Sequence, residues 1–468
     1  MTGRGRSRRS GDGPLEEGGA AEAIVVTASV DIESGPSVDT SDLDRVRSSA
    51  GQPVGGGRVR RALSGTFSSL QVRNFRLFFI GQTISNTGNW LTNVAMTLLV
   101  LNLTDSGVAV GVLAACQYGP ILLFSPWMGA VADRVDKRRT LYVTQGLAMA
   151  QSVGLALLAL MDSPPVGAVF ALAAAGGLLL SLDNPLRRSI VTEMVPRDQI
   201  HNSVVLYATI VNVSRMIGPA LAGLLVVTLG YAWCFAIDAV SYIAVLACLV
   251  MMRTSEMQRT ERRPRQKGEV RAGLRYIASI PTLWISFTML AAVGLLSYNL
   301  PVTLPLFVTD ALDSDEVLFT VLFSTFSFGA VVAAFLVAHR HLVGMGPITK
   351  GAAGFGISML LLAVVPNPGM AVPAAFLVGV TSILYMTSSS AFAQVVAEPA
   401  MHGRVLAIQT VLLAGTTPIG GPLLGWLADV AGARAPIVLG GLVALGAAAF
   451  GAVAARRTHS MEDVQLGV

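Results

Sequence analysis

Long apolar runs separated by short polar breaks make up most of the chain from about residue 76 onward. A helix needs about 20 apolar residues to cross the hydrocarbon core of a bilayer, and twelve runs reach that length. They cover residues 76–101, 108–132, 140–161, 165–185, 202–229, 231–252, 283–309, 316–339, 347–366, 369–396, 404–429 and 434–455. The pattern predicts an all-α membrane protein with twelve transmembrane helices, and the even number places both termini on the same side.

Polar stretches divide the chain into five parts. Residues 1–66 are rich in Gly, Ser, Arg and Glu without helical periodicity, which predicts a disordered tail. Its basic start is not followed directly by an apolar run, so it does not read as a signal peptide. The sequence leaves open whether this tail belongs to the mature protein. A basic linker at 253–282 separates two predicted six-helix bundles, 67–252 and 283–455, and a short tail at 456–468 ends the chain.

Charge supports a membrane location and an orientation. Only 13% of the residues are charged, about half of the share in an ordinary soluble domain. The net charge of +5 arises from Lys and Arg that gather in the tail and in loops on one side. This is the positive-inside rule, so both termini are predicted to be cytoplasmic in a multi-pass protein of the cell (inner or plasma) membrane. No nucleic-acid partner is expected. The three cysteines lie in apolar runs, too few and too scattered for a disulfide framework or a metal site.

The two halves share landmarks at one spacing. Val-Pro at 195–196 precedes Gly218-Pro219, and Glu-Pro at 398–399 precedes Gly421-Pro422. Each landmark in the second half follows its counterpart by the same 203 residues. Equal spacing indicates a duplicated six-helix unit.

A dense charge cluster lies between the second and third apolar runs, where six of the seven residues from Asp133 to Arg139 are charged. The segment resembles the signature loop between helices 2 and 3 of the major facilitator superfamily. The match falls on Gly129, Asp133, Arg134, Lys137 and Arg138, whereas Asp136 replaces the second glycine of the family pattern. The resemblance implies two pseudo-symmetric six-helix bundles with a substrate site between them near the membrane midplane. It also implies that Asp133 closes the cytoplasmic side by contact with the start of span eleven near Arg404.

The fifth run contains S-R-M-I-G-P-A-L-A-G, which resembles the antiporter motif of drug exporters in this superfamily at Gly218, Pro219 and Gly223. D-A-V-S-Y, beginning at Asp238, and N-P-L-R-R after the fourth run are similar to a drug:proton antiporter branch, the transmembrane secretion effector type, which includes enterobactin and macrolide exporters. The resemblance implies export of a small amphipathic molecule, such as a drug, antibiotic, siderophore or other natural product, in exchange for protons. Plain helix packing explains the small residues of the fifth run equally well.

Three charged residues inside the runs are candidates for proton coupling: Asp238, Asp183 and Arg215. An unpaired Arg near the middle of a span costs at least about 2.5–3.5 kcal/mol, so Arg215 faces the cavity or a partner, either functionally or as a clamp between bundles. Its depth differs from that of Asp238 by roughly 10 Å at about 1.5 Å per residue, which disfavours direct pairing. Asp238 either loads protons or has a structural role. Asp183 precedes Asn184-Pro185 and reads as the end of a fourth span that holds no embedded arginine.

Polar side chains within the spans are the candidates for a substrate cavity. Gln82, Asn86, Asn89 and Asn93 recur at steps of 4, 3 and 4 on one face of the first helix. They either line the central cavity or form amide bonds between helices, because unpaired amides are costly in hydrocarbon. Further candidates are Tyr118, Tyr298, Asn299 and Tyr385, each of which could instead be core packing. Two prolines after Asn299 predict a broken seventh helix.

Several enzyme and pump signatures are absent from the sequence. No lysine follows a glycine, which excludes a P-loop and an ATP-driven pump. Neither a Gly-x-Ser-x-Gly nor a His-Glu-x-x-His motif occurs, so we expect no enzyme activity, no cofactor and no metal. The expected partners are a small-molecule substrate, protons and the lipid bilayer, and the chain is expected to be a monomer. A nutrient importer or facilitator, or a non-transporting sensor or assembly factor, is the alternative.

Overall fold

The computed structural model describes residues 68–132, 134–258, 269–337, 343–398 and 401–465. These residues belong to one compact unit, 62–468, and every regular element among them is a helix. The predicted tail at 1–66, Asp133 and residues 259–268 of the predicted linker lie outside the described residues.

The first half of the unit contains six long helices. They are α3 (Arg73–Thr104), α4 (Gly107–Ala132), α5 (Lys137–Ala159), α6 (Val166–Glu193), α7 (Ile200–Leu229) and α8 (Tyr231–Met251), with short turns η2 (Ser68–Gln71), η3 (Arg197–Gln199) and η4 (Thr254–Glu256). In the second half, two of the predicted spans are broken into shorter helices. Its elements are α9 (Glu269–Ser279), α10 (Pro281–Leu296), α11 (Leu300–Leu306), η5 (Phe307–Ala311), α12 (Glu316–Val337), α13 (Met345–Val364), α14 (Pro368–Val396), α15 (His402–Ala414), α16 (Thr417–Ala431) and α17 (Ala435–Gln465).

Eleven helical stretches among the described residues are long and apolar enough to cross a membrane. Helix α3 is not one of them, although its 32 residues extend about 48 Å at about 1.5 Å per residue. Its polar stripe lowers the hydropathy of the segment, while its contacts with α7 and α8 place it inside the helix assembly. The all-α major facilitator architecture predicted from the sequence is confirmed, with α3 as the remaining span.

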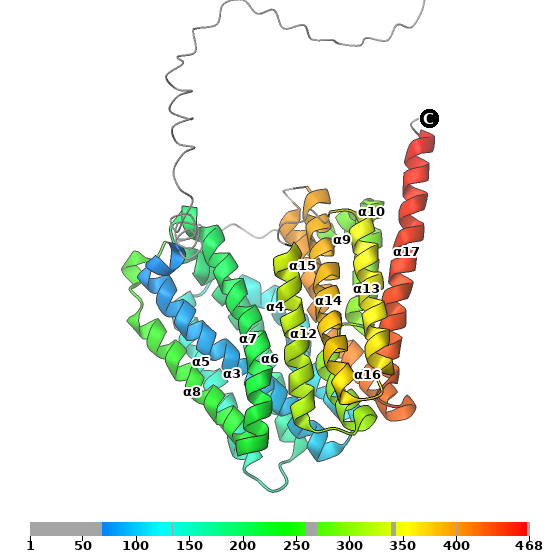
Figure 1. The fold of residues 1–468 in the computed structure, drawn as a ribbon. Helices are drawn as coiled ribbons and strands as arrows, with labels where there is room; N and C mark the ends of the chain where they lie inside the picture. Colours follow the sequence, from blue (N-terminus) through cyan, green and yellow to red (C-terminus); the bar gives the residue numbers. More distant parts are fainter. Residues whose placement is uncertain (1–67, 133, 259–268, 338–342, 399–400, 466–468) are drawn as a thin grey trace, which may run out of the picture. The chain divides into compact units, whose positions relative to one another are not determined.

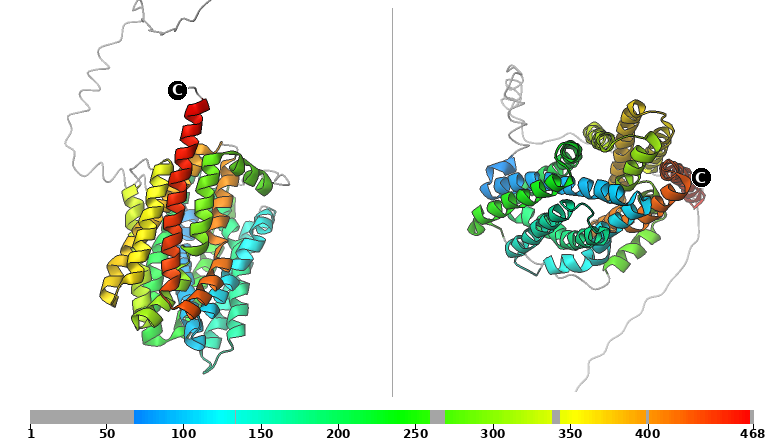
Figure 2. Two further views of the ribbon diagram at one scale, coloured as in Figure 1. Left: turned by 90° about the vertical axis from the view of Figure 1, so that its right-hand side faces the viewer. Right: turned by 90° about the horizontal axis from the view of Figure 1, so that it is seen from below.

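The helices pack as two groups (Figures 1 and 2). Helices α3 to α8 contact one another, as do α10 and α12 to α17. The groups meet mainly where α4 packs against α16 and where α7 packs against α12. We call the end of the helices where α4 begins the Gly107 end and the opposite end the Lys137 end.

Contact between the two groups is tightest at the Gly107 end. Glycines of α4 and α16 bring the two backbones together, since a Cβ at Gly421 would lie only 3.2 Å from the carbonyl oxygen of Gly111. A Cβ at Gly223 of α7 would overlap the side chain of Thr320 on α12. Small residues therefore allow the two groups to seal against each other at this end.

The fourth span differs from its prediction. Helix α6 continues to Glu193 and carries Pro185 in its interior, whereas the sequence had suggested an end at residue 185. Proline inside a membrane helix is tolerated where neighbouring helices satisfy the freed backbone groups. The consequence is that Asp183 and Arg187 lie buried within the helix, 3% and 4% exposed.

Candidate functional site

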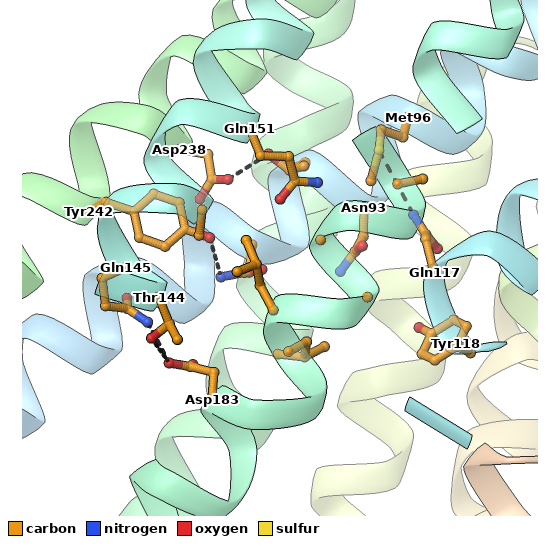
Figure 3. A pocket seen from close by; sticks show the side chains of 18 of the residues that line it. Asn93, Met96, Gln117, Tyr118, Thr144, Gln145, Gln151, Asp183, Asp238 and Tyr242 are labelled. Carbon is orange, nitrogen blue, oxygen red and sulfur yellow. Dashed lines mark hydrogen bonds between the residues drawn. The ribbon is translucent and has the colours of Figure 1, made fainter. Parts of the chain in front are cut away.

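A polar pocket lies inside the first helix group, lined by residues of α3, α4, α5, α6 and α8 (Figure 3). Its polar lining comprises Asn89, Thr92, Asn93, Gln117, Tyr118, Thr144, Gln145, Gln151, Asp183, Arg187, Asp238 and Tyr242. Small residues of α6 make room for it, because a Cβ at Gly176 or Gly177 would meet Gln151 or the α4 backbone. The volume of the pocket that is open to water is about 70 Å³. One water needs about 10–15 Å³ by that measure, so the pocket holds a few waters and no drug-sized molecule.

Asp238 on α8 is the most enclosed acid of the pocket, with 1% exposure. Its carboxylate accepts hydrogen bonds from Thr92 Oγ1 at 2.8 Å, from Ser152 Oγ at 2.7 Å and from Ser241 Oγ at 3.4 Å. Among the described residues no ion pair neutralises it. A hydroxyl can donate to a carboxylate or accept from a carboxylic acid, so this shell accommodates Asp238 with or without its proton. Arg187 and Tyr242 share the same pocket.

Asp183 and Arg187 form an ion pair one turn apart on α6. The Asp183 carboxylate also accepts hydrogen bonds from Thr144 Oγ1 at 2.9 Å and Gln145 Nε2 at 2.8 Å, both of α5 (Figure 3). Arg187 donates to the side-chain oxygen of Gln82 on α3. Two sequence predictions are therefore wrong: Asp183 does not end its helix, and the fourth span does contain an embedded arginine. Mutual neutralisation makes burial of both groups tolerable.

The four amides of α3 divide between both of their predicted roles. Asn89 and Asn93 line the pocket, and Asn89 donates to the Tyr242 hydroxyl at 3.1 Å. Asn86 donates to the backbone oxygen of Gln82 at 2.8 Å, and Gln82 itself binds Arg187. The polar face of α5 was overlooked in the sequence, although its members form two adjacent pairs that are two turns apart. They are Thr144, Gln145, Gln151 and Ser152.

The aromatic and amide candidates do not come together. Tyr118 lines the pocket, whereas the three candidates of the second group lie away from it. Tyr298 packs its ring against Phe355, and Asn299 donates to the Leu295 carbonyl at 2.8 Å across the break between α10 and α11. Tyr385 is fully buried, and its hydroxyl has no hydrogen-bond partner in the described part of the chain.

The basic residues of the signature loop bind the ends of neighbouring helices. Lys137 pairs with Glu193 at the end of α6. Arg138 donates to the Leu249 and Val250 carbonyls at the end of α8, at 2.9 and 3.1 Å. The helix dipole also stabilises a cation at this end of the helix. Asp136 caps α5 by accepting a hydrogen bond from the Arg139 amide at 3.0 Å. Aspartate in place of the second glycine of the family pattern therefore stabilises the start of this helix.

The remaining signature positions are less informative. Gly129 is half-buried in α4, and Arg134 is exposed. Asp133 lies outside the described residues, so its contact near Arg404 stays a prediction.

The segment resembling the antiporter motif packs α7 closely against two helices. A Cβ at Gly218 would overlap Trp90 of α3, and one at Gly223 would overlap Thr320 of α12. Pro219 lies within α7. Arg215, one turn before Gly218, does not bind Asp238.

The guanidinium of Arg215 lies 5.7 Å from the Trp90 ring and 5.6 Å from the Phe326 ring, measured from Cζ to the ring centroids. Trp90 belongs to the first helix group and Phe326 to the second. Arg215 therefore lies where the groups meet and is held by aromatic rings from both.

The helix arrangement and the pocket define a membrane transporter of the major facilitator class. Solved structures share the fold: the bacterial homologue of the human lysosomal transporter Spinster, inward-facing and unoccupied, matches with a TM-score of 0.65 at 14% identity, covering 82% of this chain and 97% of that one. The POT family transporter PepTSo matches with a TM-score of 0.70 at 12% identity, covering 84% and 99%.

A family model described as transmembrane secretion effector matches residues 64–465. The chain belongs to this family, which confirms the resemblance seen in the sequence and makes it a transporter rather than an enzyme by family membership.

Individual relatives are distant in sequence. The Staphyloferrin A transporter of Staphylococcus aureus (strain NCTC 8325 / PS 47) is 25% identical, covering 76% of this chain and 90% of the relative. The multidrug efflux pump Tap of Mycolicibacterium fortuitum is 23% identical, covering 79% and 94%. The enterobactin exporter EntS of Shigella flexneri is 25% identical over 47% of this chain, and the match spans about half of that relative, 53%.

Proposed function

We propose that this protein exports a small amphipathic organic molecule across the cell membrane by alternating access, in exchange for protons. Family membership and the efflux roles in the relatives' names support export. Exchange for protons is supported by the hydroxyl groups around Asp238. This carboxyl is buried and has no cationic partner in the described structure. The pocket around it is too small for an organic cargo but sufficient for water. The cargo would bind between the two helix groups instead.

Asp238 is the primary proton carrier in this proposal and Asp183 the secondary one. The shell of Asp238 joins α3, α5 and α8, so a change of protonation alters bonds between three helices. Asp183 is already paired with Arg187, and its protonation would leave that arginine uncompensated. One proton crossing 100 mV supplies about 2.3 kcal/mol, enough for more than a tenfold cargo gradient at about 1.4 kcal/mol per decade.

The test is flux in proteoliposomes with an imposed pH gradient, using a panel of amphipathic fluorescent dyes of both charges. We expect the gradient to accelerate flux for the parent and not for Asp238→Asn. Asp310→Asn is the matched control, because this exposed carboxylate binds only its neighbour Thr309 among the described residues. Flux that ignores both the gradient and Asp238→Asn would refute proton antiport and favour a facilitator.

We also propose that the Lys137 end faces the cytoplasm, with both termini on that side, and that the working unit is a monomer. In a version without Cys116, Cys234 and Cys248, a cysteine at Asp162 should react with an impermeant thiol reagent in intact cells, and one at Lys137 should not. Asp105 and Asp313 are less suitable positions, because both have positive φ values of 47° and 48° that strain most side chains. The reverse labelling pattern would invert the orientation.

A further inference from the structure

One face of α7 changes from exposed to buried along its length. Towards the Lys137 end, Val204 and Val211 are 46% and 37% exposed. Further along the same face, Ala222 is fully buried and Val226 is 7% exposed. These four positions lie on one side of the helix, because they are separated by close to whole numbers of turns. The surface that α7 turns to α12 is therefore open at the Lys137 end and sealed at the Gly107 end, and Arg215 lies at the transition.

Arg215 lacks the partners that a cation in a membrane interior needs. Its Nε is buried without a hydrogen-bond partner, and no ion pair or hydrogen bond joins its side chain to any residue that the structure describes. The buried acids of the first helix group have other partners, since Asp183 pairs with Arg187 and Asp238 is held by hydroxyls. A buried polar group without a partner calls for a ligand or a second state that satisfies it.

We propose that Arg215 is the anion-binding group of the cargo site, and that the cargo is an organic anion, a carboxylate or sulfonate with an aromatic or other apolar body. The cation–π contacts with the Trp90 and Phe326 rings involve no hydrogen-bond acceptor, and the Nε donor of the guanidinium has no partner among the described residues. The donors of a guanidinium form a planar fork that matches an anionic oxygen pair. The two rings themselves provide apolar surface, one from each helix group. This inference deepens the proposed export function by giving its cargo a charge.

A purely mechanical role for Arg215 is the competing explanation. Its two ring contacts come from different helix groups, so the stacked cation would then only clamp the groups together. A clamp does not discriminate ligands by charge, whereas an anion site does. The decisive comparison therefore uses two ligands that share a skeleton and differ by one negative charge.

The experiment measures equilibrium binding of anilinonaphthalene sulfonate and of its uncharged counterpart phenylnaphthylamine to the full-length protein in nanodiscs, with empty nanodiscs subtracted. The variants are Arg215→Gln, Arg215→Lys and the control Arg139→Gln, whose side chain is 89% exposed. We expect Arg215→Gln to weaken binding of the sulfonate about tenfold to a hundredfold, the range for hydrogen bonds to a charged group. Binding of phenylnaphthylamine should stay unchanged, which also shows that the variant is folded. Arg215→Lys should bind the sulfonate with an affinity between those of the parent and Arg215→Gln. Arg139→Gln should bind it as tightly as the parent.

Equal sulfonate affinity in the parent and Arg215→Gln, or equal losses for both ligands, would overturn the anion site. Binding at equilibrium is independent of transport. If the parent does not export but binds the sulfonate through Arg215, the proposed function is refuted and this inference stands. If the parent exports but Arg215→Gln binds the sulfonate as tightly as the parent, this inference is refuted and the proposed function stands.

Discussion

Asp429 near the end of α16 joins the two helix groups at the Gly107 end. Its carboxylate accepts hydrogen bonds from the backbone amides of Gly107 and Val108, at 2.6 and 3.0 Å, and from Ser106 Oγ at 3.0 Å. These are the first groups of α4, whose amides have no partner within the helix. An acid of one helix group thus caps a helix of the other. The cap exists only while this end is closed.

The effect of Asp429→Ala follows from that geometry. Loss of a helix cap costs about 0.5–2 kcal/mol, and loss of a negative charge at a helix start adds about 0.3–1 kcal/mol. Because Asp429 is exposed, we take a value of about 1.5 kcal/mol from the lower part of the combined range. That value shifts the equilibrium between closed and open states about tenfold, at about 1.4 kcal/mol per decade. Asp429→Asn keeps one acceptor oxygen and should shift it less.

The assay is double electron–electron resonance between spin labels at Asp162 and Asp315, exposed positions of the two helix groups at the Gly107 end. In Asp429→Ala we expect the ratio of the long-distance to the short-distance population to rise about tenfold over that of the parent. Asp310→Asn removes a charge at the same end without touching the other group, so it should leave the ratio unchanged. A distance distribution in Asp429→Ala identical to that of the parent would refute the reasoning, since the cap would then contribute nothing to closure.

Substitutions at two further positions, Gly223 and Asp183, test the helix packing and the buried ion pair. Gly223→Val places a branched side chain against Thr320 of α12, so it should open the same end in the same distance measurement, and Gly223→Ala should do so less. Asp183→Asn leaves Arg187 buried without its partner, which should lower stability by about 3–5 kcal/mol and reduce the thermal unfolding temperature of the purified protein. The double variant Asp183→Asn with Arg187→Gln removes both charges and should recover much of the loss; a double variant no more stable than the single one would contradict the ion-pair argument.

The sequence allowed the helices to be predicted because bilayer thickness sets their length and charge sets their ends. The observed bounds fall within a few residues of the predicted ones for most spans. Helix α17 runs to Gln465, past its predicted end at residue 455. The other exception is α6, where Asp183, Pro185 and Arg187 look like a helix exit. What keeps them inside is an ion pair between the two charged residues and the hydrogen bond from Arg187 to Gln82 of α3. The second of these joins residues 105 positions apart, and a one-dimensional pattern does not contain it.

The candidate site was only partly predictable for a similar reason. The amide stripe of α3 was visible as a periodicity, but its division into pocket lining and interhelical bonds depends on which helices lie opposite. The difference in depth between Asp238 and Arg215 disfavoured their pairing, and the structure does give them different partners. The hydroxyls that hold Asp238 come from three helices, and of these only Ser152 belongs to a periodic polar face, that of α5.

Helix α3 connects the proposed proton site to the proposed anion site. Thr92 donates to Asp238, while Trp90, two residues earlier, makes a cation–π contact with Arg215. Two residues turn an α-helix by about 200°, so the two contacts lie on nearly opposite faces of α3. Proton and cargo therefore need not compete for the same atoms. Protonation of Asp238 would reverse one bond of a shell that includes Thr92 of α3. Any resulting shift of α3 would move Trp90 against Arg215 at the junction of the two helix groups, where a change must arrive to alter access to the cargo site.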